Sequence, residues 1–149
     1  MGNNCMNLNR YFLHERPIFL DNISFEAMKP AESGQPMKLG CKDTIVAQRS
    51  ELGVKLTFNR TMAFEPEGLF RLSVTYGVML TFDPSTKNEV DWDGLDIAGE
   101  FRKSCGGTLT ALMSRTSLMI GQITAAAGQN PIITPAAAPI DSTGAVSNS

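Results

Sequence analysis

The sequence contains very little histidine. His14 is the single histidine among 149 residues. Zinc hydrolases, histidine-rich metal sites and most acid–base constellations need imidazole groups at several positions, or one imidazole that is held firmly in place. His14 lies between Leu13 and Glu15, before the first strand-like segment, and this position offers no spacing argument for a Ser–His–Asp triad. We therefore expect an exposed or strand-edge His14, no catalytic residue and no enzymatic activity.

Cysteine is also scarce. Cys5, Cys41 and Cys105 lie far apart, and the sequence contains no CxxC motif, so they predict neither a zinc knuckle nor a redox pair. Isolated reduced thiols are typical of a reducing compartment. The sequence shows no signal peptide at its start and no run of about 18 apolar residues, so neither secretion nor membrane insertion is expected. The predicted location is cytoplasmic.

Neither sign of charge dominates. The sequence has 13 basic and 15 acidic residues, a formal net charge of −2, which is too near neutral for a surface that coats a phosphate backbone. The acidic cluster from Glu89 to Asp96 contains an Asp-x-Asp, but it lacks the glycine and the terminal glutamate of a calcium loop. Walker, GxGxxG, GxSxG and HExxH motifs are absent. We expect no nucleic-acid partner, no metal and no cofactor.

Strand periodicity is the clearest positive signal. Apolar residues alternate with polar or small ones over Leu69–Phe82 and over Val54–Phe64, where Arg60 is the one break in the apolar face. Between them, Glu65-Pro66-Glu67-Gly68 has the proline and glycine of a tight turn. These segments predict a long antiparallel hairpin with one buried face.

Further strands are expected before this hairpin. Ile18–Ala27 predicts a third strand with Ile23 and Phe25 on its apolar face, ended by Pro30. Residues 29–43 are expected to form a loop, and Thr44–Gln48 a short fourth strand.

The periodicity becomes helical in the last third of the chain. A spacing of three from Trp92 to Phe101 predicts a short helix or irregular turn, and Thr108–Gly128 predicts a helix of about 20 residues, with Thr108 as N-cap and Gly128 as C-cap. An Ala/Pro/Ser/Gly tail over residues 136–149 is expected to be disordered. The prediction is one α+β domain over residues 1–135, with an antiparallel sheet packed against the long C-terminal helix.

The apolar stripe of this helix is wider than one sheet needs. Leu118 and Met119 extend it toward a second face, which indicates another subunit. The predicted oligomer interface consists of Leu112, Met113, Leu118 and Met119.

Methionines and one tryptophan indicate apolar working surface, because thioether side chains adapt to varied partners. Alternation places Met79 on the strand face opposite the main apolar stripe. The side chains expected outside the simplest core, and so available to a bound protein, are Met28, Met37, Met79 and Trp92.

Two segments carry a resemblance to a known family: Asn22-Ile23-Ser24-Phe25-Glu26-Ala27, and the helix around Leu112–Ile123 with its continuation into Pro131–Pro135. They resemble segments of the SecB-like export chaperones, small cytosolic bacterial proteins that hold unfolded clients and form tetramers as dimers of dimers. The first is similar to the acidic-Ile-Ser-Phe-Glu segment of the family's first strand, and the second resembles the family's arginine-containing interface helix and the proline-bearing segment after it. The resemblance runs from about Leu13 to Pro135.

The resemblance implies a partner-docking role for the first strand and client grooves between sheet, crossover loop and helix. Glu26 would be a carboxylate that docks the translocase ATPase SecA, and Asn22 stands where the family has its other acidic residue. The family's basic, zinc-contacting tail is absent, since Asp141 is the one charged residue after Pro135.

The leading hypothesis is therefore an ATP-independent holdase that binds extended hydrophobic segments of unfolded or nascent proteins and assembles as a tetramer or dimer. The alternative is a structural or adaptor subunit with the same fold and one dedicated protein partner, for example in a toxin–antitoxin or phage context. An enzyme is the third hypothesis, and turnover that disappeared in His14→Ala would support it.

Overall fold

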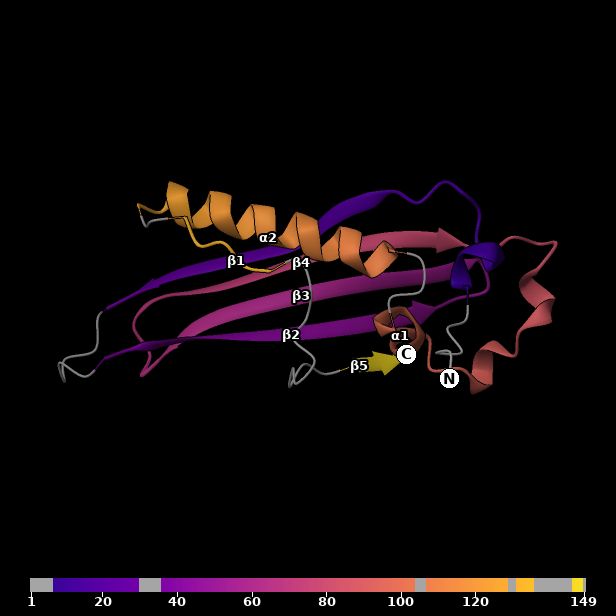
Figure 1. The fold of residues 1–149 in the computed structure, drawn as a ribbon, viewed down its shortest axis with the longest axis horizontal. Coiled ribbons are helices and arrows are strands. Elements are labelled where there is room, and N and C mark those ends of the chain that lie inside the picture. The colour runs from indigo at the N-terminus through magenta and orange to yellow at the C-terminus, as the bar shows by residue number, and fades with distance from the viewer. Residues whose placement is uncertain (1–6, 30–35, 104–106, 129–130, 136–145, 149) are drawn as a thin grey trace.

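Four long antiparallel strands form the centre of the structure. They are β1 (Ile18–Met28), β2 (Lys38–Arg49), β3 (Gly53–Glu65) and β4 (Leu69–Thr81), and a short strand, β5 (Val146–Asn148), lies parallel to β2. The spatial order is β1-β4-β3-β2-β5 (Figure 1). The computed structural model describes residues 7–29, 36–103, 107–128, 131–135 and 146–148.

Helices cover one face of this sheet. The long helix α2 (Thr108–Ala126) runs along it, and α1 (Ile97–Arg102) lies near one end (Figure 1). The described residues also form the 3-10 turns η1 (Leu8–Tyr11), η2 (Lys87–Glu89) and η3 (Trp92–Gly94). In the described part of the chain, no helix has the length and hydrophobicity that a membrane crossing requires. The predicted α+β arrangement, with the sheet packed against a long C-terminal helix, is confirmed.

The predicted antiparallel hairpin and its buried face are confirmed. β3 pairs antiparallel with β4 from Gly53 opposite Thr81 to Ala63 opposite Arg71. The residues that face the helices are at most 2 % exposed: Val54, Leu56, Phe58, Arg60, Met62, Phe70, Leu72, Val74, Val78 and Leu80. This burial supplies the main hydrophobic stabilisation of the sheet.

The opposite face of β3 and β4, called the open face here, is polar. The Asn59 side-chain amide donates to the hydroxyls of Ser73 and Thr75 at 2.8 Å each, and the Thr61 hydroxyl donates to Asn59 Oδ1 at 2.9 Å. Cross-strand hydrogen bonds of this kind link the strands where no helix packs on them.

The core has two parts. A larger one joins Phe12, Phe82 and Trp92 to α1 and the first half of α2, and Phe12 stacks on Phe82 with ring centroids 5.5 Å apart. A smaller one lies under the second half of α2 and contains Met62, Phe70, Leu72, Val74 and Ile120.

The ends of α2 differ by one residue from the prediction. Gly107 is the N-cap, with φ of 76°, and Thr108 is the first helical residue. Ala127 is the C-cap, and Gly128 follows it with φ of 85°. Both positions require left-handed backbone, which glycine adopts without a Cβ penalty.

The predicted loop over residues 29–43 is wrong at its end, because β2 begins at Lys38 rather than at Thr44. The first half of β2 pairs with Arg60–Glu65 of β3, yet Lys38–Lys42 are all exposed. Backbone pairing with β3 alone therefore holds this part of the strand. Because no described helix covers it, neither face is buried, and its sequence shows no alternation of apolar and polar residues.

The third strand predicted over Ile18–Ala27 is present as β1, and its apolar face is only partly covered within this chain. β1 forms an edge and pairs only with β4 among the described strands. Ile23 and Phe25 are each 38 % exposed.

The predicted disordered tail lies mostly outside the described residues, as do Cys5 and Cys105. The described part of that tail is Val146–Asn148, which forms β5. His14 is exposed as predicted, and Cys41 is an exposed free thiol.

Candidate functional site

In the residues that the structure describes, no group of three or more His, Cys, Asp and Glu side chains is placed to hold a metal ion. The features that stand out are a buried ion pair and several exposed apolar side chains.

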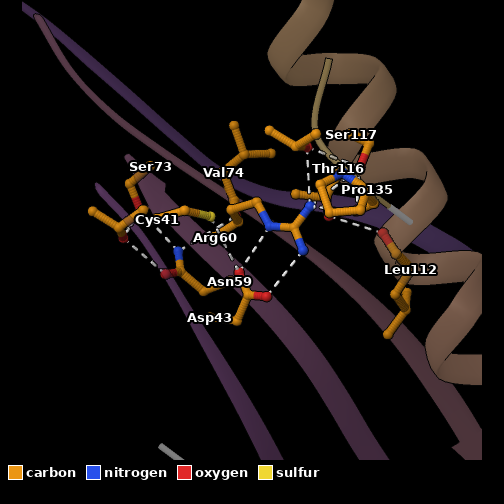
Figure 2. Close-up of polar contacts among 12 residues, drawn as sticks. Cys41, Asp43, Asn59, Arg60, Ser73, Val74, Leu112, Thr116, Ser117 and Pro135 are labelled. Carbon is orange, nitrogen blue, oxygen red and sulfur yellow. Dashed lines mark hydrogen bonds and ion pairs between the residues drawn. The ribbon is translucent and has the colours of Figure 1, made fainter. Parts of the chain in front are cut away.

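The ion pair joins Arg60 of β3 to Asp43 of β2. Arg60 Nε and Nη2 donate to the two carboxylate oxygens of Asp43 at 2.8 and 2.9 Å (Figure 2). Arg60 is 1 % exposed and Asp43 is 4 % exposed. A bidentate pair with satisfied donors is the arrangement in which a protein interior tolerates two charges.

The third nitrogen of Arg60 anchors the segment that follows the long helix. Nη1 donates to Thr134 Oγ1 at 3.0 Å, to the carbonyl of Pro135 at 2.7 Å and to Ser117 Oγ of α2 at 3.2 Å. We call Pro131–Pro135 the strap, because it runs back along α2 (Figure 1). The Ile132 amide donates to Thr124 Oγ1 at 3.0 Å, and Ile132 packs on the smaller core. Arg60 thus joins β2, β3, α2 and the strap.

The charges at this cluster are fixed by the same contacts. Burial lowers the pKa of Arg60, but the hydrogen bonds and charge of Asp43 raise that pKa by more, so the guanidinium stays protonated. Partial burial, followed by the charge of Asp43, raises the pKa of Cys41, whose sulfur lies 3.8 Å from Asp43 Oδ1. Cys41 is therefore a neutral thiol at pH 7, not an activated nucleophile.

Exposed apolar side chains gather on β1. Leu20, Ile23 and Phe25 are 43 %, 38 % and 38 % exposed, although each is a large hydrophobic residue. Phe25 stacks against Phe70 with ring centroids 5.7 Å apart, so its surface continues the smaller core outward. Exposed large apolar side chains that lie together on one strand are typical of a protein-binding face.

The predicted interface residues of α2 separate into two groups. Leu112 and Met113 are 0 % and 4 % exposed and belong to the core of this chain, so their assignment to a surface between subunits is wrong for the chain as described. Leu118 is 62 % exposed on the helix side away from the sheet, and Met119 is partly buried against the smaller core. Leu118 alone is openly available.

The predicted client-binding residues also do not come together. The placement of Trp92 outside the core is wrong: it is 7 % exposed, and its indole N–H donates to the carbonyl of Lys87 at 2.9 Å. Met28 pairs with Leu69, and partly buried Met37 precedes Lys38, which pairs with Glu65; both therefore lie near the β3–β4 turn. Met79 is 43 % exposed. It lies ten residues from Leu69 along β4, about 33 Å away at the rise of a strand.

Glu26 and Asn22 are both exposed on the open face of β1. Glu26 lies opposite Arg71 of β4, and Asn22 lies opposite Thr75. Beside them the open face has a shallow depression of about 690 Å³, lined by Lys38, Lys42, Arg71, Glu65 and Glu67 among others. The mixed charge of this depression favours no single class of ion.

Asp43, Thr134 and Ser117 were not predicted from the sequence as partners of Arg60. One signal could have found Asp43, because an arginine on the apolar face of a strand needs a buried carboxylate partner. No comparable signal pointed to the hydroxyls.

Comparison with known proteins shows the fold. No protein-family model and no curated protein sequence matches this chain. Among solved structures, the chain is similar to the SecB-like chaperone Rv1957 of Mycobacterium tuberculosis, solved in complex with a ChAD peptide from the Rv1956 HigA1 antitoxin. The TM-score is 0.63 at 8 % sequence identity, over 86 % of this chain and 92 % of that chain. The chain has the SecB-like fold.

Proposed function

We propose that this protein is an ATP-independent holdase that binds extended apolar segments of unfolded or nascent proteins. The observation that carries the proposal is the row of half-exposed apolar side chains on β1, Leu20, Ile23 and Phe25, in a chain with the SecB-like fold.

The geometry of β1 supports this proposal. An edge strand offers unpaired backbone groups along its length, and extended polypeptide can use both these groups and the apolar side chains beside them. The three residues keep 38–43 % of their surface exposed, so covering the remainder would contribute roughly 0.5–1 kcal/mol for each. Binding through such a strand is sequence-tolerant, as a holdase requires.

The test is binding of a permanently unfolded protein, reduced and carboxymethylated lactalbumin, measured by fluorescence anisotropy. We expect binding by the parent chain and a loss of at least about tenfold in affinity for the double variant Ile23→Ser/Phe25→Ser. The control is Leu52→Ser, which removes a side chain that is 80 % exposed in the β2–β3 loop, far from β1 along the sheet order. Equal loss in both variants would contradict a binding surface on β1.

A second candidate function is an adaptor with one dedicated protein partner. It is favoured by the structure of Rv1957, whose fold this chain shares and which was solved in complex with a peptide from an antitoxin. Tight capture of one protein, with no binding of unfolded lactalbumin at stoichiometric concentration, would replace the holdase proposal by this one. Docking of SecA through Glu26 is a further proposal that is compatible with either candidate function. A Glu26→Gln variant that bound purified SecA as well as the parent chain would contradict it.

A further inference from the structure

The outer edge of β2 is occupied by the chain's own C-terminal strand. β5 pairs parallel with β2 in the register Ile45 opposite Val146, Val46 opposite Ser147 and Ala47 opposite Asn148. β5 also lies beside α1 (Figure 1). The strand that ends the chain therefore extends the sheet at the edge opposite β1.

The residues of β2 show why this part of the edge needs a cover. Lysine and proline on an edge strand hinder pairing with another chain, and Lys38 and Lys42 lie in the first half of β2. Thr44–Gln48 contains no charged residue and no proline. Ile45 and Ala47 are each 1 % exposed and belong to the larger core, so packing fixes this stretch of the strand in place. This stretch is the part of β2 best suited to accept another strand, and it is the part that β5 covers.

The strand β5 that covers this stretch is short, and the chain is anchored near it at Pro135. β5 has three residues, against 12 in β2. The strap ends at Pro135, whose carbonyl accepts from Arg60, and Arg60 is paired with Asp43, two residues before Ile45. Ten residues, 136–145, join Pro135 to β5. A tether of this length gives β5 a high effective concentration at β2, although a three-residue parallel ladder has little strength of its own.

We propose that the Thr44–Gln48 edge of β2 is a strand-binding site for an extended, uncharged segment of a partner protein, and that β5 is its intramolecular competitor. The partner segment displaces β5 and pairs with the same backbone groups. The binding half of this inference rests on the proposed function, while the occupation of the edge by β5 does not.

The first experiment measures amide hydrogen exchange by NMR in the full-length chain and in Ser147→Pro, where the proline removes a backbone donor from the middle of β5. The outward-pointing amides among residues 44–48 are expected to exchange at least tenfold faster in Ser147→Pro than in the parent. Ser142→Pro, the same change outside β5, is the control and should leave their rates unchanged. Equal rates in parent and Ser147→Pro would overturn the intramolecular pairing.

The second experiment uses a labelled peptide with the sequence of residues 140–149 as the probe. We expect at least tenfold tighter binding to Ser147→Pro than to the parent or to Ser142→Pro, with renewed protection of the same β2 amides. Equal affinities in all three proteins would overturn the competition.

The lactalbumin assay separates the two proposals. Lactalbumin binding that is the same in parent and Ser147→Pro, together with unchanged amide exchange, overturns the role of β5 and leaves the holdase in place. Faster exchange and tighter peptide binding in Ser147→Pro, with no lactalbumin binding by any variant, overturn the holdase and support the strand-binding edge.

Discussion

At the scale of single residues, Arg60 decides how the strands, the helix and the strap fit together. Its five donors point in fixed directions, and three segments of the chain supply the acceptors. A hydrophobic residue at this position would pack on the same face without selecting any of them. The hydrogen bonds of Arg60 therefore select one alignment of the strands, the helix and the strap, which apolar packing alone would not specify at this site.

Removing one partner of this buried pair should be costly. We expect Asp43→Asn to lower the free energy of unfolding by about 3–5 kcal/mol, because it leaves the Arg60 charge buried without its counter-ion. The double variant Arg60→Met/Asp43→Leu should recover most of that loss, since no charge is then buried. Urea denaturation followed by circular dichroism measures both.

The matched control is Glu89→Gln, which removes the ion pair of Glu89 with Arg10, 2.8 Å long with side chains 47 % and 55 % exposed. Its cost should stay below about 1 kcal/mol, as for other solvent-exposed pairs. A cost for Asp43→Asn no larger than that of Glu89→Gln would contradict the structural role of the pair.

The sequence predicted the position of Arg60 on the apolar face but not its partners. Alternation along one strand specifies which side chains share a face. Asp43 lies on a different strand, in a segment whose exposed first half lacks that alternation, and Thr134 lies beyond the helix. Only the register between strands and the return of the strap bring these residues to Arg60.

At the scale of elements, the glycines of α2 have opposite roles. Gly128 follows the C-cap with φ of 85°, where a side chain is strained. Gly121 lies inside the helix, and a Cβ added there would meet the Ile132 carbonyl at 3.6 Å, an ordinary contact. One glycine ends the helix, while the other only weakens it.

Alanine substitutions should therefore change stability in opposite directions. We expect Gly128→Ala to destabilise the chain by about 1 kcal/mol, and Gly121→Ala to stabilise it by about 0.5–1 kcal/mol. Thermal unfolding monitored at 222 nm compares the two variants with the parent. Destabilisation by Gly121→Ala would show that the strap packs on α2 more tightly than its contacts indicate.

Long elements were predictable from sequence where one face is buried, and not where burial is absent. β3, β4 and α2 each carry a continuous apolar face, and their predicted spans agree with the structure to within about two residues. The first half of β2 is paired but uncovered, so its sequence resembles a loop. β5 was missed because three residues of an Ala/Pro/Ser/Gly tail carry no periodicity at all.

At the scale of the whole molecule, exposed apolar side chains lie in two places, on the edge strand β1 and on the outer side of α2. β1 presents Leu20, Ile23 and Phe25, and α2 presents Leu118 away from the sheet. The sequence predicted that α2 is too apolar for one sheet, but two of the four residues chosen for the interface lie in the core. Periodicity identifies which residues of α2 lie on its apolar stripe, whereas only the structure shows how much of that stripe the sheet of the same chain buries.

A homo-oligomer that uses the outer face of α2 should depend on Leu118. We expect Leu118→Glu to shift the mass measured by multi-angle light scattering from dimer or tetramer to a smaller species, because the charge would be buried without a partner. Gln122→Glu adds the same charge one turn further along the exposed side of α2 and should leave the mass unchanged. An unchanged mass for Leu118→Glu would place the subunit contact elsewhere.

The two edges of the sheet differ in what they allow between copies of this chain. β1 is an edge along its whole length, whereas at the other side of the sheet β5 covers Ile45–Ala47 of β2, and Lys38 and Lys42 lie in the uncovered first half of that strand. Two copies that joined their sheets through β1 would each have used that edge, and lysines and a short strand hinder pairing at the other, so growth would stop at a closed pair with two-fold symmetry. A chain that lost β5 would expose the uncharged stretch of β2 and gain a route to fibrils.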